Sequence, residues 1–244
     1  MSRLPIAAAM AAALVVALGL SRPSAGQPAQ NASSQPLIAQ ASGPVYKPPI
    51  RGAPQGRIGG ATRGAVGDLP KLEVLAPDHV GWSAADQPTL YWFLSRDATQ
   101  TVQFVLTVDT QAKPILEIEL AKPVKAGING LALASHGVRL QPLVEYDWSV
   151  VIVTDPGQRS SDVLAAGSIK FVPPAGELAG RLAAAPQAGK AAAYAEAGYW
   201  YDSIKILSDD VDKAGGSAPA RLGRAALLEQ VGLADAAAFD RRAR

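Results

Sequence analysis

Cysteine is absent from the 244-residue sequence, and histidine occurs only at His79 and His136. Without cysteine, the protein cannot form a disulfide framework, an iron–sulfur cluster, a thiolate metal site or a cysteine nucleophile. The two histidines lie far apart in the sequence and offer little material for a catalytic zinc site. We therefore predict no metal site. Because the sequence also has no P-loop, dinucleotide fingerprint, His-Glu-x-x-His motif or Gly-x-Ser-x-Gly nucleophile elbow, we predict no cofactor and no catalytic residue.

An excess of charge of one sign is also missing. Two of the 23 basic residues, Arg3 and Arg22, lie in a segment that we expect to be removed, and the others balance the 21 acidic residues. A strongly basic surface is typical of nucleic-acid-binding proteins. The charge balance therefore predicts no nucleic-acid partner.

The first 25 residues have the pattern of a secretory signal peptide. Arg3 precedes an apolar run from Ile6 to Leu20, and small residues follow at Ser24 to Gly26. The run is shorter than the roughly 20 residues that span a bilayer. We predict that residues 1–25 are cleaved and that the mature protein is periplasmic or secreted, with no transmembrane segment.

Residues 26–67 are rich in proline and glycine and contain a single aromatic residue, Tyr46. Such a composition predicts a disordered arm, because little apolar surface is available to offset the entropy of ordering. Arg51, Arg57 and Arg63 recur at intervals in this arm and suggest two functions. They could bind a carboxylate or phosphate, or they could lie loosely on an acidic body and contribute less than about 1 kcal/mol to stability.

Residues 68–174 have the pattern of a β-sandwich. Alternating apolar residues or apolar runs bounded by turn signals predict seven strands, at residues 72–75, 89–94, 102–108, 115–120, 131–134, 146–154 and 163–172. A turn is expected at Gly127–Gly130. The segment from Leu140 to Trp148 resembles the tyrosine corner of fibronectin type III domains, so we expect the Tyr146 hydroxyl to bond to upstream backbone and Trp148 to be buried. The fold class is therefore α+β, beginning with an immunoglobulin- or fibronectin-III-like sandwich.

Residues 175–244 are alanine-rich and predict helices at 176–185, 187–197 and 201–213, with two more around Gly232. The stretch from Tyr194 to Leu207 resembles the centre of a tetratricopeptide helical hairpin. Two predicted strands are apolar on both faces, which would expose Tyr91, Phe93, Val151 and Val153. We expect the helices to pack there, with Trp200 and Leu207 as anchors.

Other candidate sites in the sequence have simpler structural explanations. Ser135 and His136 could belong to a hydrolase triad, but adjacent residues rarely face each other, and they more closely match a strand end. The acidic stretch at residues 209–212 lacks the alternating ligands and the later glutamate of a calcium loop. Trp82 and the aromatic residues around Trp92 could form a sugar-binding platform, although core packing is the more common role of such residues.

The segments IRGAPQGRIGGATRG, DQPTLYWFLS, EYDWSVVIVTDPGQRSSDV and YAEAGYWYDSI together resemble a bacterial family known as domain of unknown function 928. The resemblance runs from about Lys47 to the last helix. Many members of that family have a cysteine just after the Arg-Gly pair, where this sequence has Ala65, so a disulfide role cannot transfer. The resemblance implies an exported protein and supplies no activity or ligand.

These observations predict a non-enzymatic protein-interaction or structural module of the bacterial envelope, whose partner is another envelope or secreted protein. The alternatives are a carbohydrate- or envelope-binding module that uses Trp82 or the arginine-rich arm, and an enzyme of unrecognised type.

Overall fold

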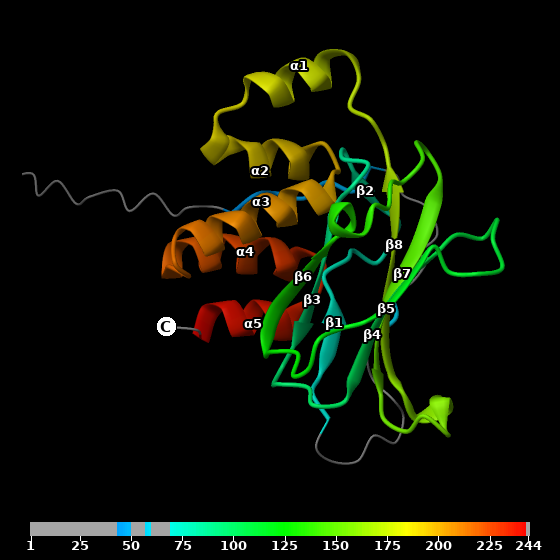
Figure 1. Ribbon diagram of the computed structural model, residues 1–244. Coiled ribbons are helices and arrows are strands. Elements are labelled where there is room, and N and C mark those ends of the chain that lie inside the picture. Colours follow the sequence, from blue (N-terminus) through cyan, green and yellow to red (C-terminus); the bar gives the residue numbers. More distant parts are fainter. Residues whose placement is uncertain (1–42, 50–56, 60–68, 243–244) are drawn as a thin grey trace, which may run out of the picture. The chain divides into compact units, whose positions relative to one another are not determined.

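The computed structural model describes residues 43–49, 57–59 and 69–242. Within these residues the chain forms two β-sheets and five α-helices, an α+β fold (Figure 1). The predicted signal peptide and most of the predicted arm lie outside the described residues. No helix among the described residues is long and apolar enough to cross a membrane.

The strands form one sheet of three and one of five. The order in the smaller sheet is β1-β3-β6, with β1 at Leu72–Val74, β3 at Thr89–Leu94 and β6 at Gly127–Ala132. The larger sheet has the order β2-β8-β7-β4-β5, comprising β2 at Gly81–Ser83, β8 at Val163–Phe171, β7 at Glu145–Val153, β4 at Thr101–Thr107 and β5 at Leu116–Glu119. Neighbouring strands are antiparallel except for β2 and β8, which are parallel.

Six of the seven predicted strands lie within about two residues of the observed ones, and two features were predicted wrongly. Strand β2 was missed, because three residues are too few to show an alternating pattern. The expected turn at Gly127–Gly130 belongs to β6, which pairs with β3 along its whole length. Gly130 lies opposite Tyr91, and a Cβ atom at Gly130 would lie 2.7 Å from the Tyr91 ring. The glycine therefore makes room for an aromatic ring within the sheet and does not mark a turn.

Both sheets contribute aromatic side chains to one apolar core. Trp92 of β3 contacts Phe104 of β4, with ring centroids 6.4 Å apart, and Phe104 contacts Trp148 of β7 at 6.0 Å. The alternation of β4 buries Val102, Phe104 and Leu106. Burying each large apolar side chain contributes roughly 1.5–3 kcal/mol, so this core is the main source of stability in the strand region.

The predicted tyrosine-corner bond is present. The Tyr146 hydroxyl accepts a hydrogen bond of 2.9 Å from the backbone N–H of Gln141, five residues upstream. Trp148 is 1% exposed, as predicted. This bond holds the approach to β7 against the start of the strand.

The helices follow one another as neighbours from α1 to α5 (Figure 1). Their bounds are Gly176–Ala184 for α1, Gln187–Glu196 for α2, Trp200–Lys213 for α3, Ala218–Gln230 for α4 and Ala234–Arg242 for α5. Pro186 separates α1 from α2, and Gly198, at φ 86°, separates α2 from α3. Because proline and glycine interrupt helices, the observed bounds of α1, α2 and α3 are close to the predicted ones.

Helices α3 and α5 contact β2, β3 and β6. Trp200 at the start of α3 is completely buried, and its indole N–H donates to the carbonyl of Leu75 at 2.7 Å. Phe239 of α5 packs on Phe93 of β3, with ring centroids 5.5 Å apart. The outer face of the three-stranded sheet is therefore covered by helices.

Val151 and Val153, which were also expected beneath the helices, belong to the five-stranded sheet. In the register of that sheet, Val151 lies between Gln103 of β4 and Leu164 of β8. Among the described residues, the main helix–sheet contacts are with β2, β3 and β6 and not with β7, so the expectation that the helices cover both apolar strands is corrected.

Candidate functional site

Two adjoining cavities lie along helix α2, and Lys190 and Tyr194 line both of them. One has a volume of about 400 Å³ and is otherwise lined by Pro174, Ala179, Leu182 and Ala183. The other has a volume of about 270 Å³ and is otherwise lined by Gln187, Asp202, Lys205, Ile206 and Asp209. We call the two cavities together the α2 groove. One of its ends is apolar, and the other is charged.

The helical repeat explains why these side chains share the groove. Lys190 and Tyr194 are four residues apart on α2 and therefore lie on one face of that helix. Asp202, Lys205 and Asp209 have similar spacing on α3. The short connection through Gly198 places α3 beside α2 (Figure 1), so the two faces meet along one cavity.

Asp202 is the most perturbed acid near the groove. Its side chain is half-buried, and burial raises its pKa to about 7. The backbone N–H of Ala84 donates to Oδ2 of Asp202 at 2.7 Å, which favours the ionised form and opposes the rise in pKa. A carboxyl group with this pKa is partly protonated at neutral pH, so it can donate or accept a hydrogen bond. A perturbed acid in a cleft marks a candidate functional residue.

The two lysines of the groove differ in their ionic partners. Lys205 donates to Asp209 at 2.7 Å, four residues along α3. Lys190 is half-buried and has no ion-pair partner within the part of the chain that the structure describes. The groove therefore presents one uncompensated cation beside its apolar end, an arrangement that suits a ligand with an anionic and an apolar group.

An aromatic series extends from the groove to strand β2. Tyr194 contacts Tyr199, with ring centroids 6.0 Å apart, and Tyr199 contacts Trp82 at 5.8 Å. Burial, assisted by the charge of Asp202, raises the pKa of both tyrosines. Trp82 is half-buried and meets Tyr199 edge to face. It therefore contributes to packing and still keeps part of its surface accessible.

Among the arginines of the predicted arm, Arg57 is described, whereas Arg51 and Arg63 lie outside the described residues. Its guanidinium donates to the carbonyl oxygens of Ala76 at 2.9 Å and Val231 at 3.0 Å. Val231 directly follows α4, where exposed carbonyls attract a cation. The expectation of a loose arm is therefore wrong at Arg57, because its guanidinium bonds both to the segment that follows β1 and to the residue that follows α4.

Tyr46 is also docked, although the composition of the arm predicted disorder. It is 8% exposed, packs edge to face on Trp200 at 5.1 Å, and forms a 2.9 Å hydrogen bond with Nε2 of His79. A single aromatic residue in a proline- and glycine-rich segment was the available signal. Tyr46 and Arg57 therefore have a structural role, because their contacts hold residues 43–49 and 57–59 on the rest of the described chain.

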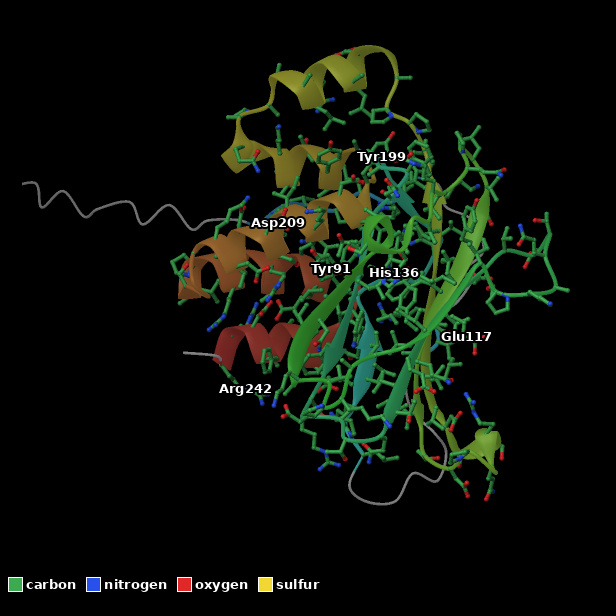
Figure 2. The ribbon with its side chains drawn as sticks, viewed as in Figure 1. Tyr91, Glu117, His136, Tyr199, Asp209 and Arg242 are labelled. Carbon is green, nitrogen blue, oxygen red and sulfur yellow. The ribbon has the colours of Figure 1, made fainter. Side chains whose placement is uncertain are left out.

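The remaining sequence candidates do not assemble. Ser135 and His136 are exposed in a short 3₁₀ helix, Leu133–His136 (Figure 2). Asp209 pairs with Lys205 on α3. Among the described residues, no three His, Asp or Glu side chains are placed to hold a metal ion.

Sequence reasoning did not select Lys190, Tyr194 and Asp202 as one site. Their helical spacing was visible, but the packing of α2 against α3 that brings them together was not. In the sequence, Tyr194 and Asp202 drew notice only through the stretches that resemble a tetratricopeptide hairpin and the domain of unknown function.

Residues 58–239 match the family described as Domain of Unknown Function (DUF928). The chain belongs to this family. The match covers most of the chain, including both sheets and nearly all of the helical region. No curated protein matches the chain.

Proposed function

We propose that this DUF928 protein is an exported, non-enzymatic interaction module of the bacterial envelope, and that it binds a partner protein through the α2 groove. The observation that carries this proposal is the half-buried Lys190, which lies between the apolar and charged ends of the groove without an ionic partner among the described residues. A protein segment that presents a carboxylate next to aliphatic side chains matches this arrangement.

The finer fold assignment belongs to the same proposal. The bond between Tyr146 and Gln141 supports a fibronectin-III-like sandwich. The pairing of α2 with α3 across Gly198 supports a tetratricopeptide-like hairpin. In this assignment the sandwich is a rigid support that holds α3 through Trp200, and the helices present the binding surface.

The binding proposal is tested with two charge-reversal variants of the full chain. Lys190→Glu reverses the cation in the groove, whereas Lys213→Glu makes the same change in net charge at the exposed end of α3. Each variant and the unmodified protein serve as bait for envelope extracts. A partner that binds the unmodified protein and Lys213→Glu but not Lys190→Glu supports the groove. Equal capture by all three baits contradicts it.

Export is tested separately by N-terminal sequencing of the protein recovered from periplasm or medium. The segment from Arg3 to Gly26 predicts a mature protein that begins near residue 26. An intact Met1 together with recovery in the membrane fraction would overturn this part of the proposal.

A glycan-binding function is the second candidate, because part of Trp82 remains accessible beside Tyr199. Aromatic faces bind sugars through apolar contact, so Trp82→Ala would abolish retention on envelope glycans while Lys190→Glu would leave it unchanged. If the unmodified protein is not retained on envelope glycans, or if Trp82→Ala is retained as well as the unmodified protein, this second function is contradicted.

A further inference from the structure

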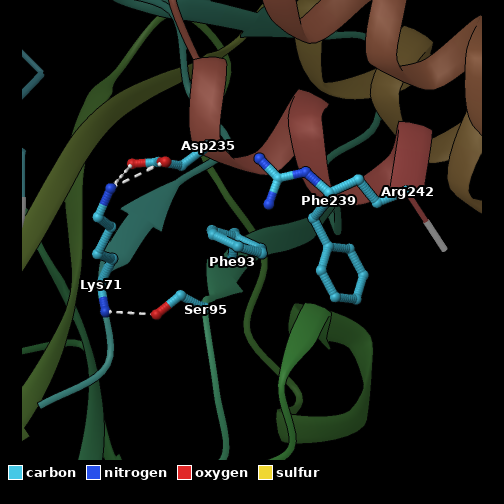
Figure 3. Close-up of a pocket in the computed structure, with 6 residues that line it drawn as sticks. All are labelled: Lys71, Phe93, Ser95, Asp235, Phe239 and Arg242. Atoms are coloured by element: carbon cyan, nitrogen blue, oxygen red, sulfur yellow. Dashed lines mark hydrogen bonds and ion pairs between the residues drawn. The ribbon is translucent and has the colours of Figure 1, made fainter. Parts of the chain in front are cut away.

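A separate cavity, which shares no lining residue with the α2 groove, lies between the three-stranded sheet and α5. It has a volume of about 390 Å³ and is lined by Lys71, Phe93, Ser95, Asp235, Phe239 and Arg242 (Figure 3). Pockets of this size lie at the lower end of the range that holds small organic ligands. Its lining combines apolar rings with charged side chains.

The apolar part of this cavity is aromatic. Phe93 of β3 is 3% exposed, and Phe239 of α5 lies against it with ring centroids 5.5 Å apart. Gly127 faces the Phe239 ring, where a Cβ atom would come within 2.9 Å of Cζ. The close approach of β6 therefore holds Phe239 in place, and an apolar ligand would meet a rigid aromatic wall.

The two cations of the cavity are in different electrostatic states. Nζ of Lys71 contacts both carboxylate oxygens of Asp235, at 3.0 and 2.9 Å, so its charge is compensated. Arg242 is exposed, and no described residue forms an ion pair or hydrogen bond with its guanidinium. Figure 3 shows this guanidinium turned back from the end of α5 toward Phe93.

The charges favour a monoanion over a dianion. With Lys71 compensated by Asp235, the lining carries a single net positive charge, that of Arg242. Arg242 lies at the C-terminal end of α5, where the helix dipole disfavours additional negative charge. A carboxylate matches the planar fork of arginine with two parallel hydrogen bonds.

We infer that this cavity binds a small aromatic or aliphatic monocarboxylate, with its carboxylate on Arg242 and its apolar body against Phe93 and Phe239. The Ser95 hydroxyl lines the same cavity and accepts a hydrogen bond of 2.9 Å from the backbone N–H of Lys71. This site is separate from the α2 groove, so it does not depend on the proposed protein-binding function.

The test is calorimetric titration of the full chain with 3-phenylpropanoate, alongside its neutral analogue 3-phenylpropan-1-ol. Loss of a charge-assisted, bidentate contact weakens binding about tenfold or more. We expect Arg242→Ala to weaken 3-phenylpropanoate binding by this factor. We also expect the unmodified protein to bind the neutral alcohol about as weakly as Arg242→Ala binds 3-phenylpropanoate.

Arg241→Ala is the matched control, because Arg241 is the preceding residue and pairs with Glu229 at 2.7 Å outside the cavity. It should bind 3-phenylpropanoate like the unmodified protein. Arg242→Lys keeps the charge but not the fork and should show an intermediate affinity. Thermal unfolding of each variant verifies that it is folded.

Three outcomes would overturn the inference. They are no saturable binding of 3-phenylpropanoate up to about 10 mM, equal loss in Arg241→Ala and Arg242→Ala, and equal affinity for the acid and the alcohol. Acetate tests the aromatic wall: binding as tight as that of 3-phenylpropanoate would contradict a role for Phe93 and Phe239.

Discussion

The sheets bury large apolar and aromatic side chains, whereas the helices bury many alanines together with charged residues. Trp148, Phe104 and Leu106 belong to the core of the sheets. In the helices, Arg224 and Asp240 are 6% and 2% exposed. The guanidinium of Arg224 contacts both carboxylate oxygens of Asp240, at 2.7 and 2.8 Å.

This difference shows how an alanine-rich region acquires a defined structure. Buried alanine contributes little apolar area, so alanine packing alone specifies helix positions poorly. The ion pair joins α4 to α5, and Arg224 also donates to the Ser208 hydroxyl of α3 at 3.2 Å. Three helices are thus linked by directional bonds, while the sheets are held mainly by apolar packing.

The largest expected effect follows from breaking this buried ion pair. Asp240→Ala leaves Arg224 charged and unpaired in the interior, which should cost about 3–5 kcal/mol of unfolding free energy. Asp235→Ala is the matched control, because its pair with Lys71 is exposed and worth less than about 1 kcal/mol. Urea denaturation measures both. Similar losses in the two variants would show that the helices do not depend on the buried pair.

The next effect concerns the polar link between sheet and helix. The Tyr201 hydroxyl accepts from Nε1 of Trp148 at 2.9 Å and donates to the carbonyl of Ser168 at 3.0 Å. Tyr201→Phe leaves both partners unsatisfied and should cost about 1–3 kcal/mol. Tyr194→Phe, on the half-buried face of α2, is the control and should change unfolding little. A single unfolding transition in all variants would support cooperation between the sheets and helices.

A smaller effect is expected at the docked arm. Arg57→Ala removes hydrogen bonds from a cation to the carbonyls of Ala76 and Val231, and we expect a loss of about 1–2 kcal/mol. A change below a few tenths of a kcal/mol would instead restore the sequence-based expectation of a loose arm. Comparison of denaturation midpoints for Arg57→Ala and the unmodified chain distinguishes the two.

The last expected effect is a pH dependence at Asp202. Its folded-state pKa is raised to about 7, so between about pH 4 and 7 the folded protein binds a proton that the unfolded chain releases. Its contribution therefore makes the protein less stable as pH rises through this range. Asp202→Asn removes that dependence and still offers an oxygen to the N–H of Ala84. Unfolding measured at pH 5 and pH 8 should show a smaller difference in the variant, and an unchanged difference would contradict the raised pKa.

Much of the local structure could be predicted because its determinants are close in sequence. Alternation in residues 101–107 indicated β4, and Pro186 and Gly198 marked the limits of α2. The Tyr146 bond spans only five residues. Each of these features depends on backbone preferences or side-chain spacing that a short window contains.

The candidate sites required the tertiary structure. The α2 groove joins residues of α2 and α3 to Pro174, and the separate cavity beside α5 joins Lys71 to Arg242 across nearly the whole folded chain. Likewise, Arg57 meets Val231 across 174 positions. By itself, the sequence determined where most strands and helices begin and end, because periodicity and turn residues act locally. Only the tertiary structure decided which charges are compensated and which line a cavity, because that depends on side chains brought together from distant segments.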